Sequence, residues 1–490
     1  MLMNKFPFYI FLVAAIIISG INLSQKVHYS PDDTYIYMQY ARNLAAGNGF
    51  SFNAGEPGYG ITSPVWASLV SVGYLIGADG YWFAKIIDLI FALIAVFIFF
   101  KLAGEIFKKI FAENPEKIRN LQFLSTAVFI LNSWFIRWIF TGMETSLAVF
   151  LLLLIFYQVY REKYLASFAL LGIFFLVRPE GFVLFFTFLL YMFYKRMGVK
   201  KIIFCTAIYS VIVILFFLYA YHSFGTIFPN TTLGKATFSF GAGIYYEQVK
   251  KIFQTLALSN IIEIILSAVF IVYLFKNKKT GMLTPFFVWI AGLISLYIIT
   301  DADIISRYLL IIIPLLIITG GGAIGISKYY KLISVIFFIV IFVQSESVFY
   351  KFVKTHTDNF TMGVNNCLIY TGKWLNENTP ANSKILVNDV GAIGYYSNRY
   401  IIDAAALVNR DLKLNREIIN TPVEVRESTA NLLKFIDADY LVERDSKPGN
   451  TISGIGNKRL EFIFEKEFPS LGISDPNPKY YKVYKVINGN

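Results

Sequence analysis

The hydrophobic positions of this chain gather into long runs that are separated by short polar connections. A helix of about 20 apolar residues is long enough to cross the roughly 30 Å hydrocarbon core of a bilayer. The pattern predicts about eleven spans. They lie near residues 6–24, 80–101, 121–140, 144–160, 164–177, 181–194, 202–221, 256–275, 282–300, 308–326 and 332–347. The first run has no small-residue cleavage signature before Gln25, so it is expected to remain as an anchor.

One further apolar run, at 62–77, is short for a span, and the distribution of charge decides how it is counted. With eleven spans, the connections rich in lysine and arginine all fall on one side, which is the positive-inside pattern of a cytoplasmic face. Counting 62–77 as a span would move the basic connection at 101–119 to the other side. We therefore expect 62–77 to be an interfacial or re-entrant helix within the first outer loop, residues 25–79.

The last part of the chain, from about residue 348, has a different hydrophobic pattern, with shorter apolar stretches between turn residues. A helix is expected at 364–378, and a turn at Asp389–Gly391 after the first strand. Strands are expected at 384–388, 400–402, 439–443, 461–466 and 480–486. The predicted fold class is an α-helical polytopic membrane protein, with a transmembrane domain at 1–347 and an extracytoplasmic α/β domain at 348–490.

Composition supports this reading and excludes others. The chain is 56% hydrophobic and only 16% charged, which is too apolar for a soluble protein of 490 residues. Its net charge of +12 comes from short clusters between apolar runs, so no nucleic-acid partner is expected. Cys205 and Cys367 suggest neither a disulfide nor a thiol nucleophile.

Polar clusters that abut the apolar runs all fall on the predicted outer face. They are Asp32-Asp33 with Arg42-Asn43, Thr141–Thr145 with Glu144, Arg178–Gly181 with Glu180, Phe228–Thr232 with Asn230 and the nearby Lys235, and Ser306–Tyr308 with Arg307. Each alone has an ordinary structural explanation. Ser30 and Asp33 can cap a helix, Arg178 and Glu180 can form a buried ion pair, and Arg307 can extend toward the membrane surface. Because all five share one face, we expect them to meet in one pocket.

The third cluster is expected to lie below the membrane surface. The runs at 164–177 and 181–194 are each short for a bilayer crossing at 1.5 Å per residue. Their connecting turn, Arg178–Gly181, is therefore predicted to sit inside a cavity. A charge at that depth costs a few kcal/mol unless it is paired, so a partner or a functional role is expected.

Carboxylates at a membrane boundary, with cations and a large apolar body nearby, suit transfer of a sugar from a lipid phosphate. An aspartate would take the proton of an acceptor hydroxyl as it attacks the anomeric carbon from the opposite face, with inversion. Arginine or lysine would stabilise the charge developing on the phosphate. No cofactor is expected, and His28 near Asp32 is read as a loop residue rather than a metal ligand, although a divalent metal stays an open alternative.

The motifs also carry a resemblance to a known family. They are DDTYIYMQYARNLAAGNGFSFNAGEPGYGITSPVW, TGMET, RPEG, FPNTTLGK and SRYLL, in this order. This set resembles the GT-C superfamily of polyprenyl-phosphate-sugar-dependent glycosyltransferases over roughly residues 6–347. It is most similar to the branch that contains the mycobacterial terminal arabinofuranosyltransferase, and more distantly to protein mannosyltransferases. The segment from WLNENTP to AAALVN resembles the outer domain common in that branch, apart from its run of three alanines at 404–406.

The resemblance implies roles for individual residues. It implies that Asp32 is the general base, with Asp33 as the alternative, and that Lys235 and Arg307 lie near the lipid phosphate. Arg178, Glu180, Asn230, Glu144 and Arg42 are the other expected substrate-binding residues. The expected partners are a polyprenyl-phosphate sugar donor, a glycan, glycolipid or protein acceptor, and the lipid bilayer.

Two rival hypotheses stay open at this point. An oligosaccharyltransferase or ligase would use a lipid diphosphate donor, and such enzymes typically need a divalent metal. A transporter of lipid-linked sugars would be expected to show an internal repeat and charged residues at mid-membrane, and neither is evident in the sequence. The expected location is the cytoplasmic membrane, with the active site and the C-terminal domain on its outer face.

Overall fold

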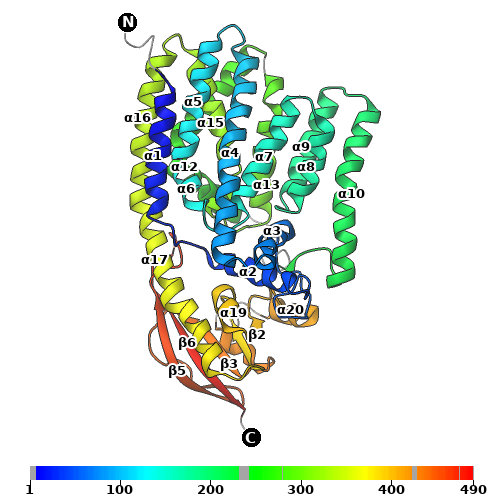
Figure 1. Ribbon diagram of the computed structural model, residues 1–490, viewed down its shortest axis with the longest axis vertical. Helices are drawn as coiled ribbons and strands as arrows, with labels where there is room; N and C mark the ends of the chain where they lie inside the picture. Colours follow the sequence, from blue (N-terminus) through cyan, green and yellow to red (C-terminus); the bar gives the residue numbers. More distant parts are fainter. Residues whose placement is uncertain (1–6, 231–241, 279, 422–427, 474, 489–490) are drawn as a thin grey trace.

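The computed structural model describes residues 7–230, 242–278, 280–421, 428–473 and 475–488. A bundle of apolar helices stands above a smaller domain that contains a sheet (Figure 1). The helices of the bundle are α1 (Tyr9–Ser24), α4 (Gly80–Ile110), α5 (Pro115–Leu131), α6 (Ser133–Trp138), α7 (Thr145–Tyr160), α8 (Tyr164–Phe175), α9 (Gly181–Tyr194), α10 (Val199–Phe224), α12 (Ala242–Lys276), α13 (Thr284–Ile299), α14 (Ser306–Leu309), α15 (Ile313–Ile326) and α16 (Tyr330–Val348).

Four helices of the described chain are long and apolar enough to cross a membrane: α4, α10, most of α12, and the helix that begins with α16. Shorter apolar helices, among them α1, α7, α8, α9, α13 and α15, lie at other ranges where spans are predicted. The fold class predicted from the apolar runs is therefore confirmed, and the count of eleven spans stays a prediction.

Small residues let α15 pack closely at the centre of the bundle. A Cβ added to Gly321 would lie 2.4 Å from Ser125 Oγ, and one added to Gly325 would lie 2.6 Å from Leu121 Cδ1. Association of helices in a membrane depends on such close packing, because lipid tails are as apolar as the side chains. A large residue at either glycine would push α15 away from α5.

Two short helices of the first outer loop lie between the bundle and the smaller domain (Figure 1). They are α2 (Asp32–Ala45) and α3 (Pro64–Leu75). The Ser63 hydroxyl caps α3 by accepting from the backbone N–H of Trp66, as the Ser63-Pro64 pair suggests. The run at 62–77 forms α3, whose 12 residues are short for a span, as predicted, and its place on the outer side stays a prediction.

The predicted capping of α2 is wrong. Ser30 was expected at the N-cap, with Asp33 in a capping box, but the N-cap is Pro31 and no side chain caps the helix. Asp32 and Asp33 are its first two residues, so their backbone is helical while their side chains are free to reach other elements. Both carboxylates do so, as described below.

The last helix of the bundle continues without a break into the smaller domain. Helical backbone runs from Tyr330 to Asn378, through α16, η3 (Phe349–Lys354), α17 (Thr355–Gly363), η4 (Val364–Ile369) and α18 (Tyr370–Asn378). The predicted domain boundary at 347/348 falls within this continuous helix. Buried residues of the bundle and of the smaller domain also belong to one hydrophobic core, so the two parts pack as one body.

A six-stranded mixed sheet forms the smaller domain, in the order β2-β1-β3-β6-β5-β4. Strand β1 pairs parallel with β2 and β3, whereas β6 pairs antiparallel with β3 and β5. The strands are β1 (Lys384–Val387), β2 (Tyr400–Asp403), β3 (Tyr440–Asp445), β4 (Gly454–Ile455), β5 (Lys458–Phe468) and β6 (Lys479–Asn488), with α19 (Gly391–Ser397), α20 (Leu412–Asn420) and η5 (Thr429–Lys434) between them. The five predicted strands all form, and each end lies within three residues of its expected position.

The first outer loop covers the edge of this sheet. The side-chain amide of Asn53 donates to the backbone carbonyl of Ile401 and accepts from its N–H, each at 2.9 Å. Because β2 is an edge strand, these bonds satisfy backbone groups that the sheet leaves unpaired. They fix the smaller domain against the same loop that carries Asp32 and Asp33.

Candidate active site

A cavity of about 800 Å³ lies at the end of the bundle that faces the smaller domain. The start of α2, the turns before α7 and α9, and the segment from the end of α13 to α14 contribute its walls. Leu407 of the smaller domain also lines it. Four of the five polar clusters predicted to share a pocket thus have members in this cavity or its walls, although Asn230 is not among the lining residues and Lys235 lies outside the described residues.

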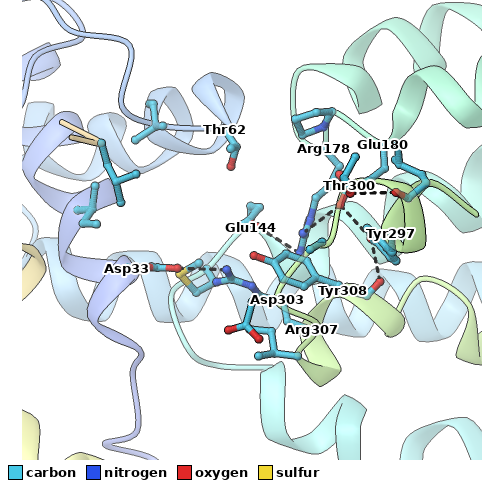
Figure 2. Close-up of a pocket in the computed structure, with 18 of the residues that line it drawn as sticks. Asp33, Thr62, Glu144, Arg178, Glu180, Tyr297, Thr300, Asp303, Arg307 and Tyr308 are labelled. Atoms are coloured by element: carbon cyan, nitrogen blue, oxygen red, sulfur yellow. Dashed lines mark hydrogen bonds and ion pairs between the residues drawn. The ribbon is translucent and has the colours of Figure 1, made fainter. Parts of the chain in front are cut away.

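Asp33 and Arg307 form an ion pair within the cavity. An Arg307 Nη2 hydrogen donates to Asp33 Oδ2 at 3.1 Å, although 274 residues separate the two in the chain. Figure 2 shows the two side chains pointing toward one another from α2 and α14. The Arg307 side chain is 7% exposed, whereas that of Asp33 is 43% exposed. Asp33 is therefore a carboxylate that a substrate in the cavity can reach.

Aromatic side chains hold Arg307 in place. Its guanidinium lies 5.6 Å from the ring centre of Trp138 and 5.4 Å from that of Tyr308. The Trp138 indole N–H donates to Ser306 Oγ at 2.8 Å, which anchors the turn that carries Arg307. Such cation–π contacts gain strength in a desolvated site.

A second ion cluster lies beside the first (Figure 2). Arg178 Nη2 is 3.3 Å from Glu144 Oε1, and Arg178 Nη1 is 3.8 Å from Glu180 Oε1. The Tyr297 hydroxyl donates to Glu180 at 2.9 Å, and all four side chains are buried. The expected cavity position of the Arg178–Gly181 turn is therefore observed, and its charges are paired as the cost of burial requires.

Several polar atoms of these clusters still have bonding capacity. Within the described part of the chain, the Nε atoms of Arg178 and Arg307 and the Oε2 atoms of Glu144 and Glu180 have no hydrogen-bond partner. Buried polar atoms are nearly always satisfied in folded proteins, by protein, water or ligand. Water or a polar ligand can satisfy these atoms, because the lining offers guanidinium donors, Arg178 and Arg307, beside several carboxylate acceptors.

Asp32 points away from this cavity. Its two carboxylate oxygens accept the backbone N–H groups of Gly391 and Ala392, at 2.9 and 2.8 Å, where α19 begins. A Cβ on Gly391 would lie 2.1 Å from the Asp32 backbone oxygen, so only glycine allows this approach. Asp32 thus occupies two backbone N–H groups at the start of α19.

The pKa of Asp32 is raised to about 7, mainly by burial and then by the charge of Asp389, against the lowering effect of the two backbone hydrogen bonds. Such a pKa would suit a general base, but a general base must also lie within hydrogen-bond reach of the substrate proton that it takes. Asp32 is not among the lining residues, and both of its oxygens are bonded to α19. The carboxylate that meets Arg307 in the cavity is that of Asp33.

Two other predicted site residues contact the smaller domain instead. Arg42 donates to the backbone oxygen of Tyr395 and lies 4.7 Å from the centre of its ring. The Asn230 amide donates to the backbone oxygen of Asn409 at 3.0 Å. Neither residue lines the cavity. The predicted donor-binding role of Lys235 concerns a position outside the described residues.

Sequence reasoning missed a buried support for the Thr141–Thr145 turn. Asp88, inside α4, accepts from the backbone N–H groups of Thr141 and Gly142, at 2.7 and 3.1 Å. The Trp66 indole donates to the Gly142 carbonyl at 3.0 Å, and Lys85 donates to the Tyr29 carbonyl at 2.7 Å. These contacts fix the turn before Glu144 and the start of the outer loop.

The sequence does contain a signal for these contacts, because charged residues occur inside apolar helices. Lys85 and Asp88 lie in α4, and Glu263 lies in α12, each almost fully buried. These three residues are not among the site residues predicted from the sequence. A buried charge inside an apolar helix is costly and marks a polar contact with another segment.

Comparisons with known proteins agree with this architecture. A family model described as a domain of unknown function, DUF8728, matches residues 360–485, which form most of the smaller domain. No curated protein matches the sequence. ArnT from Cupriavidus metallidurans has a solved apo structure with a TM-score of 0.57 and 11% identity, covering 96% of this chain and 97% of that chain. The chain has the ArnT-type GT-C fold.

Two further solved structures support this assignment. ArnT bound to undecaprenyl phosphate gives a TM-score of 0.56 at 10% identity, with 96% of this chain and 97% of that chain covered. An oligosaccharyltransferase from Archaeoglobus fulgidus, tethered to an acceptor peptide containing the NVT sequon, gives 0.53 at 11% identity, covering 89% of this chain and 69% of that chain. The GT-C expectation is thus confirmed for the fold, and the arabinofuranosyltransferase branch stays a prediction.

Proposed function

We propose that this protein is an inverting glycosyltransferase that moves a sugar from a polyprenyl-phosphate donor to a cell-envelope glycan, a glycolipid or a protein. The observation that carries the proposal is the Asp33–Arg307 pair within a large cavity of a GT-C fold. The fold alone would leave the chemistry open. The pair supplies one accessible carboxylate and one buried cation within hydrogen-bond distance of each other.

Asp33 is the group we assign as general base. It would take the proton of an acceptor hydroxyl while the hydroxyl oxygen attacks the anomeric carbon of the donor sugar. The bond between that carbon and the phosphate oxygen breaks, and its electron pair leaves with the lipid phosphate. Attack from the face opposite the leaving group inverts the anomeric centre. A lipid phosphate needs no proton to leave, so a single base is sufficient.

Arg307 and Arg178 are the groups we assign to the donor phosphate. A guanidinium can hold two phosphate oxygens at once, and its charge stabilises the phosphate as the sugar departs. The Nε atoms of both arginines have no hydrogen-bond partner among the described residues, so the two have capacity for a ligand. When Arg307 turns toward a phosphate, its hold on Asp33 weakens and the carboxylate becomes a better base.

Asp32 then has a positioning role. By binding the start of α19 it fixes the first turn of α2, and thereby the backbone of Asp33, against the smaller domain. The apolar lining residues offer the donor lipid a path along the cavity toward the membrane. They include Ile36, Phe182, Leu296 and Ile305.

The location we propose follows from the charge pattern. Lysine- and arginine-rich connections lie at the far end of the bundle, so the cavity and the smaller domain would face outward from the cytoplasmic membrane. The donor would reach the cavity from the outer leaflet, and the acceptor would enter from the aqueous side beside Leu407.

A lipid-diphosphate-dependent oligosaccharyltransferase is the second candidate, favoured by the likeness to the archaeal structure. Such a reaction would call on a divalent metal. Among the described residues, no group of three or more His, Cys, Asp or Glu is placed to hold one. Incubation with a chelator separates the two proposals. Transfer from a lipid monophosphate sugar should persist, whereas loss of transfer that is restored by Mg²⁺ or Mn²⁺ would favour the second.

The proposed function is tested with the full-length protein purified in detergent. Undecaprenyl phosphate binding is measured first, and transfer is then assayed from a panel of polyprenyl-phosphate pentoses and hexoses, with the anomeric form of the product read by NMR. Mass spectrometry of envelope glycans from a deletion strain identifies the sugar and the acceptor. Product of retained configuration, or failure to bind undecaprenyl phosphate, would overturn the proposal.

A further inference from the structure

A second cavity, of about 610 Å³, opens at the other end of the bundle. The helices α7, α9 and α13 connect the two cavities. Glu144 and Tyr160 flank the two ends of α7, and each lines a different cavity. At 1.5 Å per residue, the 16 residues of α7 place the two cavities about 24 Å apart. The second cavity is thus separate from the proposed transfer site.

Positive charge dominates the second cavity. Of the residues that the structure describes, four lysines and one carboxylate, that of Glu162, line it. The lysines are Lys109 at the end of α4, Lys195 after α9, Lys201 in the first turn of α10 and Lys278 after α12. Four chain segments that are distant in sequence thus present ammonium groups to one space. Like charges gathered around a cavity repel one another, and a bound anion removes that cost.

Tyrosines hold several of these lysines at the cavity wall. Lys201 Nζ lies 4.4 Å from the ring centre of Tyr164, and Lys195 Nζ lies 5.6 Å from that of Tyr191. Lys109 donates to the Tyr160 carbonyl at 2.9 Å. All four lysines are exposed to solvent, so an anion that enters the cavity can reach their ammonium groups.

We propose that this cavity, defined by Lys109, Lys195, Lys201 and Lys278, binds a phosphate-bearing anion. Lysine ammonium groups are compact donors that suit phosphate oxygens, and tyrosine hydroxyls add further donors. Basic pockets between membrane helices commonly bind lipid headgroups on the cytoplasmic side. Exposed apolar side chains of the adjoining helix ends, such as Phe193 and Val199, would contact the acyl chains of such a lipid. A soluble phosphate compound offers the same chemistry without the chains.

The experiment uses the full-length protein in detergent, with three probes: dioctanoyl phosphatidylglycerol, dioctanoyl phosphatidylcholine and inorganic phosphate. Affinity is measured for the wild type, for Lys109→Gln/Lys201→Gln, and for the matched control Lys108→Gln/Lys200→Gln. The control removes two exposed lysines that directly precede the cavity lysines and do not line the cavity. The control variant therefore lowers the net charge of the protein by the same amount as the cavity variant.

We expect phosphatidylglycerol or inorganic phosphate to bind about tenfold more weakly to the cavity variant and less than twofold more weakly to the control. Binding of phosphatidylglycerol alone identifies a lipid headgroup as the source, and binding of inorganic phosphate identifies a soluble one. Lys109→Arg/Lys201→Arg should restore affinity, which separates loss of charge from misfolding. The proposal is overturned if neither anion binds, if phosphatidylcholine binds as well as phosphatidylglycerol, or if both glutamine pairs weaken binding equally.

Discussion

Arg307 donates a hydrogen bond to the carboxylate of Asp33 at 3.1 Å, and this bond joins the first outer loop to the turn that precedes α15. Its two partners differ in accessibility, since Asp33 is 43% exposed and Arg307 only 7%. An incoming anion can therefore compete for Arg307, while an incoming hydroxyl can approach Asp33. The pair thus combines the two capabilities that sugar transfer from a lipid phosphate requires.

Replacing Arg307 should weaken donor binding. In Arg307→Gln the affinity for undecaprenyl phosphate should fall by about 10- to 100-fold, because a hydrogen bond to a charged group contributes roughly 1.5–3 kcal/mol. Binding is measured with the purified protein. Lys331→Gln, which breaks the ion pair with Glu116 at the other end of the bundle, is the matched control and should bind normally. Equal affinities of wild type and Arg307→Gln would contradict the assigned role.

Removing the cation of the second cluster should destabilise the protein. Arg178→Met leaves two buried carboxylates without their cation, which costs about 3–5 kcal/mol when one partner of a buried pair is lost. The midpoint of thermal unfolding in detergent reports this change. Adding Glu144→Gln and Glu180→Gln to the same variant should recover much of the loss, since the uncompensated charges disappear. A single variant as stable as the wild type would show that the cluster is unpaired in solution.

Asp32 should make stability depend on pH. Its pKa is raised to about 7 in the folded protein, from an ordinary value near 4. Between these values the folded state keeps a proton that the unfolded chain has released, so this contribution to stability is full below about pH 4 and is lost as pH rises through about 7. Asp403, whose pKa is raised to about 6 mainly by burial, contributes with the same sign.

The measurement is the unfolding midpoint at several values between pH 4 and 8. Asp32→Asn should flatten part of the decline with rising pH, whereas Asp437→Asn, an exposed carboxylate of the smaller domain, should leave it unchanged. A wild-type midpoint that rises over this range, or an Asp32→Asn variant with the wild-type slope, would contradict the raised pKa.

Much of the architecture was predictable because membrane helices and buried strands leave a strong pattern in the chain. The apolar runs and the strand at 384–388 appear where expected, since both depend on local hydrophobicity. The gathering of Asp33, Glu144, Arg178 and Arg307 was also predictable, because all four abut apolar runs on one face.

Which side chains enter the cavity was not predictable in the same way. Asp32 and Asp33 are adjacent on α2, and adjacent helical residues point in directions about 100° apart. One therefore meets Arg307 and the other meets α19, but only the position of the smaller domain decides which. Arg42 and Asn230 were also expected in the cavity, because their clusters abut apolar runs on the same face. They contact the smaller domain instead.

The most direct test of the central claim compares Asp33→Asn with Asp32→Asn in the purified protein. Each variant removes one carboxylate charge from the same helical turn, so the two are matched. We predict that Asp33→Asn still binds undecaprenyl phosphate but transfers sugar at least 100-fold more slowly, as expected when a general base is lost.

Asp32→Asn should retain a substantial part of the wild-type turnover, with its main effect on stability. This ranking, measured as single-turnover transfer from a lipid-phosphate sugar with binding recorded in parallel, is the result that the account predicts. The opposite ranking, with Asp32→Asn inactive and Asp33→Asn near wild type, would contradict it.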